Sequence, residues 1–306
     1  MIRRDALRAV ALGGLLFGVA EVRAESYPSR PVTLLVGGAP GSVPDVMIRP
    51  IADRLSTALG QPFVVENRPG AAGSIAISAL LHSPADGQTL AVATMSQAVF
   101  NTYLFAKLPY DPLRDLEPIA PLVTGAMALA KAQPDKYLVA IPQLGSPPHI
   151  VGLLLDRALG VEVTMVPHRS GADAVNAVVS GQIPLLFDAP TIISNQVRAG
   201  KLKALVVTGR QREPVLPETP TALEGGFDVQ GEAWIGLVAP RGTPPAVVQR
   251  LNREVSSVME RSDIRQAMAG LSFRTLASTP EAFRALIEAD HVKWSAVIRE
   301  AGLRLE

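Results

Sequence analysis

Short runs of consecutive apolar residues alternate along the chain with longer segments whose apolar residues recur at helical spacing. Val32–Val36 is rich in β-branched residues and apolar throughout, which is typical of a strand buried on both faces of a parallel sheet. The segment 45–59 carries a roughly helical apolar stripe and is followed by Gly60, which predicts an amphipathic helix. Pro50 lies inside it, and we expect this residue to kink the helix or delay its start.

The same alternation continues to the end of the chain. Further strands are predicted at 63–65, 88–94, 137–141, 161–166, 183–187, 202–208 and 234–239, and further helices at 74–81, 150–159, 172–180, 245–259, 263–269 and 280–301. This order favours an α/β fold with open parallel sheets and helices on both faces. A length of 306 residues is enough for about two domains with well-filled cores.

The first 24 residues have the pattern of a signal peptide. Arg3, Arg4 and Arg8 precede the apolar stretch Ala9–Ala20, and Val22-Arg23-Ala24 offers small residues at a cleavage site. We therefore expect export to the periplasm by the Sec or the twin-arginine route, since a paired arginine fits both. The apolar stretch is too short to span a bilayer, and the alternative is an N-terminal helix of the folded domain.

Composition and charge narrow the possible functions. The whole chain has 29 Lys and Arg against 28 Asp and Glu, and removal of 1–24 leaves 25 against 26, so no basic surface for nucleic acid is indicated. The absence of cysteine excludes thiol catalysis, Cys-ligated metals and disulfides. No nucleophile elbow, Walker loop or zinc-protease motif occurs, and the four histidines have no ligand spacing. We expect no enzyme activity, no cofactor and no metal.

One local pattern recurs four times: a strand, a turn of small residues and the start of a helix. It occurs at 37–45, 94–101, 143–149 and 167–173. Helix N-termini leave backbone N–H groups unpaired and favour negative charge, so several of them facing one cleft would bind a carboxylate. Ordinary α/β proteins also contain such turns. The pattern alone therefore does not decide between a carboxylate site and turns that have no role in binding.

The order of several segments adds a resemblance to a known family. The segments are Tyr27–Val32, Val64–Gly73 (VVENRPGAAG), Ser83–Gly87, Leu108–Pro112, Val166-Pro167, Phe187-Asp188, Ala199–Ala204 and Ala239–Pro244. Together they resemble the Bug-type extracytoplasmic solute receptors, the substrate-binding proteins of tripartite tricarboxylate transporters. Residues 66–70 are the most specific part of the resemblance, and we interpret them as a structural turn in preference to a ligand contact.

The resemblance implies a type II periplasmic-binding-protein fold, with two lobes of mostly parallel sheets joined by crossover strands. Lobe 1 would comprise 25–121 and 238–306, and lobe 2 would comprise 122–237. The family holds a small organic carboxylate at loops that follow strands. Carried over by position, the ligand-binding residues would be Pro40, Gly41, Ser42, Asp45, Thr94, Ser96, Gln97, Gly145, Ser146, His149, His168, Ser170 and Asp188. Asp188 would contact an amino group or a bridging water, with a helix cap as the alternative.

The chain departs from the family pattern at four places. Pro44 and the pair Pro147-Pro148 remove amide donors from two of the loops, and His168-Arg169 replaces a usual Tyr-Lys. Between 122 and 130 the chain is expected to lack about 15–20 residues of a crossover strand and its loop. This deficit would shorten one connection between the lobes.

The sequence therefore predicts a monomeric periplasmic receptor that delivers a small carboxylate to the subunits of a membrane transporter or to a sensor. Two alternatives remain open. A degenerate receptor would have lost ligand binding and would act through protein interaction. A secreted α/β enzyme would use His149 or His168 as a base near Asp188.

Overall fold

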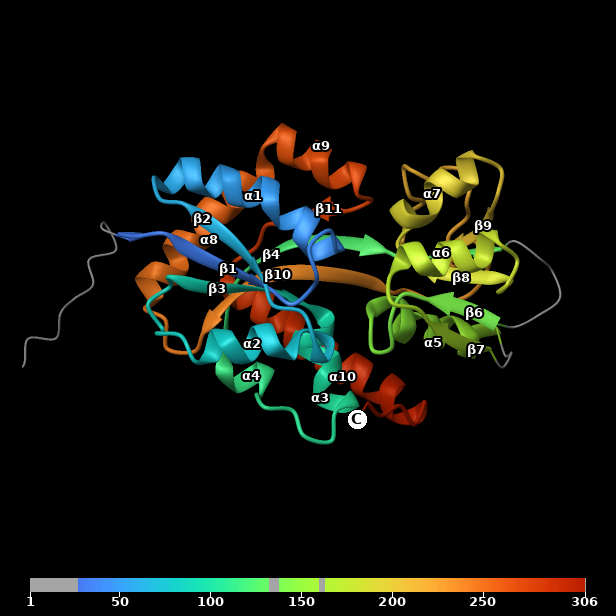
Figure 1. Cartoon of the computed structure of the whole chain (residues 1–306), viewed down its shortest axis with the longest axis horizontal. Coiled ribbons are helices and arrows are strands. Elements are labelled where there is room, and N and C mark those ends of the chain that lie inside the picture. Colours follow the sequence, from blue (N-terminus) through green and yellow to red (C-terminus); the bar gives the residue numbers. More distant parts are fainter. Residues whose placement is uncertain (1–26, 132–137, 160–162, 306) are drawn as a thin grey trace, which may run out of the picture.

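The apolar runs of the sequence form the central strands of two separate sheets, which lie side by side in Figure 1. The structure is a computed structural model, and it describes residues 27–131, 138–159 and 163–305. The predicted signal peptide lies outside the described residues. So do residue 137 of the strand predicted at 137–141 and residues 161 and 162 of the strand predicted at 161–166.

The first sheet combines a trio of parallel strands with three further strands that join it through antiparallel pairs. Its members are β1 (Val32–Val36), β2 (Phe63–Asn67), β3 (Thr89–Thr94), β4 (Leu116–Ala126), β10 (Glu232–Pro240) and β11 (Arg274–Thr275), in the order β11-β4-β10-β3-β1-β2. β1 pairs in parallel with β2 and β3, as its apolar sequence predicts. β10 runs antiparallel to both β3 and β4.

The second sheet repeats this arrangement. Its members are β5 (Ala128–Lys131), β6 (Leu138–Ile141), β7 (Thr164–Pro167), β8 (Leu185–Asp188) and β9 (Lys203–Val207), in the order β7-β6-β8-β5-β9. β6 is parallel to β7 and β8, and β5 is antiparallel to β8 and β9. In each sheet, the strand next to the three parallel strands belongs to a connection between the sheets: β10 in the first and β5 in the second. Both strands pair in the antiparallel sense, whereas we expected mostly parallel sheets.

Two passages of the chain join the sheets. β4 continues through Met127 into β5, and the loop after β9 returns the chain to β10. Figure 1 shows β4 and β10 extending side by side from the first sheet toward the second. The predicted lobe boundaries at 121/122 and 237/238 fall inside these two strands. A crossover strand is present near 122–130, because β4 (Leu116–Ala126) continues through Met127 into β5; the expected deficit of about 15–20 residues in this part of the chain stays a prediction.

Helices cover both sheets. They are α1 (Val43–Leu59), α2 (Ser74–Leu81), α3 (Asn101–Leu104), α4 (Pro112–Asp115), α5 (Pro147–Leu159), α6 (Gly171–Val179), α7 (Pro190–Arg198), α8 (Pro245–Glu260), α9 (Ser262–Gly270) and α10 (Pro280–Glu300), with a 3-10 turn η2 (Ala71–Gly73) and a π-helical turn η3 (Ser96–Phe100). α1 already begins at Val43 and runs through Pro50, so this proline does not delay its start.

Buried side chains connect the two sheets on one side. One apolar cluster contains Phe100 and Trp294 from the first-sheet part together with Ile141, Ile150 and Phe187 from the second. The two parts therefore share packed surface in addition to the two connecting passages. Among the residues described, no helix is long and apolar enough to cross a membrane.

Candidate functional site

The residues predicted to bind the ligand lie in five loops, each at the carboxyl end of a strand. Pro40, Gly41, Ser42 and Asp45 follow β1; Thr94 ends β3 and precedes Ser96 and Gln97; Gly145, Ser146 and His149 follow β6; His168 and Ser170 follow β7; and Asp188 ends β8. Carboxyl ends of parallel strands are the usual place for ligands in α/β sheets. Hydrogen bonds and close contacts unite these residues in local groups, and one bond joins loops of the two sheets.

In the first loop, Asp45 is engaged by its own helix. Its Oδ2 accepts hydrogen bonds from the Gly41 N–H at 2.8 Å and from Arg49 Nε at 3.1 Å, and its Oδ1 accepts from Arg49 Nη2 at 2.6 Å. The bonds from Arg49 are the main cause of a pKa below the usual value for Asp45. The hydroxyl of Ser42 is buried without a partner among the described residues. Asp45 thus shapes this loop, and the Ser42 hydroxyl is left available.

The specific sequence motif at residues 66–70 supports this first loop from the neighbouring strand. Asn67 Nδ2 donates a hydrogen bond to the Gly38 carbonyl at 3.0 Å, and the Arg68 N–H donates to the Val36 carbonyl at 2.8 Å. Glu66 and Arg68 form an exposed ion pair at 2.7 Å. These contacts hold the end of β2 against the turn after β1, which agrees with the structural interpretation of the motif.

Gln97 fills the space between two glycines. Its Oε1 accepts hydrogen bonds from the Thr94 N–H at 2.7 Å and from Thr94 Oγ1 at 2.5 Å. A Cβ at Gly73 would lie 1.8 Å from Gln97 Nε2, and a Cβ at Gly37 would lie 2.6 Å from it. Gly73 also has a φ of +85°, a conformation that strongly favours glycine. The Gly-rich turn of the motif therefore leaves the room that the Gln97 amide occupies.

Ser96 and Gln97 begin the π-helical turn η3, in which the Asn101 N–H bonds to the carbonyl of Ser96. Side chains bind two carbonyls of this turn: Tyr110 Oη donates to the Gln97 carbonyl at 2.9 Å, and His291 Nε2 lies 2.8 Å from the Ala98 carbonyl. π-helical turns occur often at functional sites. Sequence reasoning missed this turn and its two supporting residues, because both lie outside the loop that they support.

One hydrogen bond joins the loops of the two sheets. Ser96 Oγ donates to the Gly145 carbonyl at 3.0 Å, and the Gly145 N–H donates to His149 Nδ1, also at 3.0 Å. His149 is 3% exposed, and burial lowers its pKa to about 4. A neutral ring is required here because Nδ1 must accept the Gly145 N–H. The structure thus brings together Ser96, Gly145 and His149, three of the residues that the family resemblance assigns to the ligand site.

Asp188 is a buried carboxyl group with one free oxygen. Its Oδ1 accepts the Ala189 N–H at 2.7 Å, while Oδ2 is buried with no partner among the described residues and lies 2.5 Å from where a Cβ of Gly171 would be. Burial raises the pKa of Asp188 to about 7. α7 has Ala189 as its N-cap and has no side-chain cap hydrogen bond, so the structure does not bear out the alternative role of Asp188 as the cap of this helix.

His168 lies at an open pocket of about 710 Å³ on the second-sheet side. The pocket is lined by Gln143, Leu144, Pro167, His168, Arg169 and Asp173. Arg169 and Gln143 can donate hydrogen bonds to an anion, and Asp173 already accepts from Ser170 Oγ at 3.0 Å. The sequence singled out His168 and Ser170 but not Gln143, Arg169 or Asp173, although all of them stand in the recurring turns.

The arrangement offers hydrogen-bond donors and the N-termini of helices, and its two histidines already contact backbone groups. His149 is committed to Gly145, and His168 Nδ1 lies 3.0 Å from the Val166 carbonyl. Across residues 27–131, 138–159 and 163–305, no group of three or more His, Asp or Glu side chains could hold a metal ion. Such loops suit the binding of a small polar anion.

Comparison with known proteins gives a consistent result. Residues 47–303 match a protein family described as the tripartite tricarboxylate transporter family receptor. Similar solved structures include Rpa4515 of R. palustris with adipate (28% identity, TM-score 0.83, 91% of this chain and 100% of that one) and MatC of Rhodopseudomonas palustris with bound malate (33%, 0.79, 89% and 100%). The periplasmic binding protein BugD is also similar (28%, 0.80, 91% and 100%).

Proposed function

The chain belongs to the tripartite tricarboxylate transporter receptor family, and from this premise we propose that it is a periplasmic receptor that captures a small organic carboxylate between its two lobes. The Bug-type resemblance and the two-lobe fold of this family are confirmed. The observation that carries the proposal is the meeting of loops from both sheets at the Ser96–Gly145 hydrogen bond. A ligand held by both sets of loops would favour lobe closure, as in other hinged binding proteins.

Hydrogen-bond donors in these loops support a carboxylate as the ligand. Ser42 and Gln97 stand after strands of the first sheet, and Gln143 and Arg169 stand after strands of the second. Two similar proteins have structures with dicarboxylates, malate and adipate. Pro147 and Pro148 occupy the first turn of α5 and cannot donate, so this chain would rely more on side chains there than on amides. Delivery would be to a membrane transporter or a sensor.

A thermal-shift screen of the purified mature protein tests the proposal. Malate, adipate and citrate are compared with the uncharged diamide of adipate, which has the same chain length. A carboxylate present at about 100 times its dissociation constant stabilises the folded state by roughly 2.7 kcal/mol, whereas the diamide should have no effect. A folded protein whose melting temperature no carboxylate raises would contradict the proposal and favour the degenerate-receptor alternative.

A pair of serine variants locates the binding. Ser96→Ala removes the hydroxyl that contacts the Gly145 carbonyl at the proposed site. Ser83→Ala removes a hydroxyl that bonds to the Ala79 carbonyl just beyond the end of α2, outside the five loops. We expect only Ser96→Ala to weaken the carboxylate-induced shift. An equal shift in both variants would place the ligand elsewhere.

A further inference from the structure

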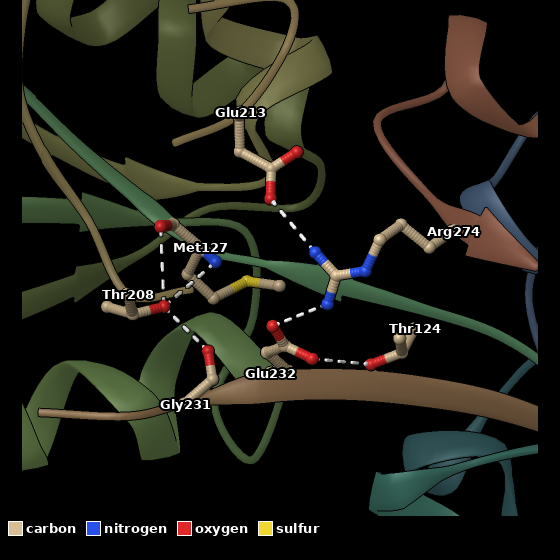
Figure 2. A network of polar contacts seen from close by, with 7 residues as sticks. All are labelled: Thr124, Met127, Thr208, Glu213, Gly231, Glu232 and Arg274. Atoms are coloured by element: carbon tan, nitrogen blue, oxygen red, sulfur yellow. Dashed lines mark hydrogen bonds and ion pairs between the residues drawn. The ribbon is translucent and has the colours of Figure 1, made fainter. Parts of the chain in front are cut away.

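The two passages between the sheets are tied together at one buried threonine. Figure 2 shows Thr208, which follows β9, between Met127 of the first passage and Gly231 of the second. Thr208 Oγ1 accepts the Met127 N–H at 3.0 Å and donates to the Gly231 carbonyl at 2.6 Å. The Thr208 N–H donates to the Met127 carbonyl at 2.9 Å. We call Met127, Thr208 and Gly231 the hinge point, because any change of angle between the sheets must pivot near them.

An arginine from the far edge of the first sheet reaches this region. Arg274 lies on β11, and its Nη2 donates to Glu232 Oε1 at 2.6 Å (Figure 2). Its Nη1 lies 4.0 Å from Glu213 Oε1, in the loop between β9 and β10. Glu232 is also in contact with Thr124 of β4, whose Oγ1 donates to Oε2 at 3.3 Å. The guanidinium therefore spans from the first sheet to the segment that returns from the second.

Glu213 depends on this contact more than a surface carboxylate would. Its side chain is 4% exposed, and besides Arg274 it interacts with the backbone N–H of Ala126. Burial raises the pKa of Glu213, and the positive charge of Arg274 opposes this effect. A buried carboxylate that loses its cationic partner is strongly disfavoured. A movement that separates Glu213 from Arg274 is therefore costly.

The other ion pair between the two parts is of a different kind. Within the described chain, Arg157 of α5 and Glu300 of α10 also bridge them, but both side chains are more than half exposed. Exposed ion pairs contribute little, whereas the Glu213 pair is shielded on its acidic side. The contact at the hinge is thus the ion pair best placed to resist a change in the angle between the sheets.

We propose that Glu213, Glu232 and Arg274 form a hinge latch that holds the two sheets at the angle shown in Figure 1. Arg274 of β11 and Glu232 of β10 lie on either side of β4 in the first sheet and move together. Glu213 moves with the loop that follows β9, so the Arg274–Glu213 contact lengthens or shortens as the lobes rotate. This inference concerns the chain without ligand and goes beyond the proposed carboxylate binding. The thermal-shift screen tests carboxylate binding, and its outcome does not depend on the latch.

Distance measurement between two spin labels tests the latch without any ligand. The chain contains no cysteine, so Ser257→Cys on α8 and Ala199→Cys after α7 provide two unique labels on exposed positions of the two parts. Pulsed electron paramagnetic resonance then gives the distribution of interlobe distances in the mature protein. The latch variants are Arg274→Gln and, with nearly unchanged volume, Glu213→Gln. The control is Arg54→Gln, which breaks the Arg54–Asp263 pair at 2.7 Å within the first-sheet part.

We expect a single distance in the doubly labelled parent and in Arg54→Gln, and a second distance in both latch variants. An ion pair at 4.0 Å with one half-exposed partner is worth up to about a fivefold change in a two-state ratio. The Arg274→Gln, Glu213→Gln double variant should open no further than Arg274→Gln alone, because Arg274→Gln already removes the contact that Glu213→Gln breaks. The proposal would be overturned if the latch variants fold but give the same distance distribution as the parent. It would also be overturned if the parent distribution is already broad and the variants leave it unchanged.

Discussion

Protonation of His149 should destabilise the protein at acidic pH, and the size of the effect follows from its burial. The ring is 3% exposed, and its Nδ1 accepts the Gly145 N–H at 3.0 Å. A proton on Nδ1 would place two donors against each other. The folded-state pKa of about 4 lies below the unfolded value of 6.5, so the unfolded chain binds the proton more tightly. Stability is therefore fully present above pH 6.5, is lost as pH falls toward 4, and changes no further below it.

A shift of this size corresponds to about 3 kcal/mol of unfolding free energy between pH 7 and pH 4. His149→Asn isolates the contribution, because its side-chain oxygen can still accept the Gly145 N–H but does not titrate in this range. Urea denaturation of both proteins is measured at several pH values from 7 to 4. The variant should lose less stability than the parent, by about 3 kcal/mol over that range. A parent-minus-variant difference that stays constant with pH would refute the role assigned to His149.

Two further predictions concern the same loops. Gly73→Ala should lower the unfolding free energy, measured by urea denaturation, clearly more than Gly60→Ala does. Both positions have a positive φ, which alone costs about 1 kcal/mol in a residue with a Cβ, but only the Cβ at Gly73 would collide with Gln97. Equal losses in the two variants would show that Gln97 moves freely. The pKa of Asp188 is raised to about 7 in the folded state, above its unfolded value of 3.8. The unfolding free energy of the parent should therefore fall relative to that of Asp188→Asn as pH rises from 3.8 to 7. A difference in unfolding free energy that stays constant across about pH 4–7.5 would mean that Oδ2 has a donor.

Most of the fold could be predicted from local patterns. The run Val32–Val36 became β1 with the same bounds, and the helix predicted at 245–259 became Pro245–Glu260. The crossover strand β4 could not be read in this way, because Pro118, Pro121 and Gly125 interrupt it as they would a loop. The structure accommodates the prolines because the pairing of β4 with β10 shifts register twice along its length.

The loops of the site were predictable by position but not in their contacts. The turn after each strand marked Ser96 and Gly145, yet nothing local indicates that the hydroxyl of one reaches the carbonyl of the other. The same holds for His291, which supports η3 from a helix far along the chain. Arg274 and Glu213 are separated in the sequence by β10, α8 and α9, and only the assembled sheets bring their charges together.

The central position of β10 has a consequence for how the chain acquires its structure. β10 lies between β3 and β4, whereas all strands of the second sheet lie between residues 128 and 207. In a chain that emerges N-terminus first, the second lobe can be completed while β3 and β4 still present unpaired edges. The first lobe must wait for the last quarter of the sequence, and these pairings of high contact order form late. The exposed edges of the waiting strands would be the natural substrate of a chaperone.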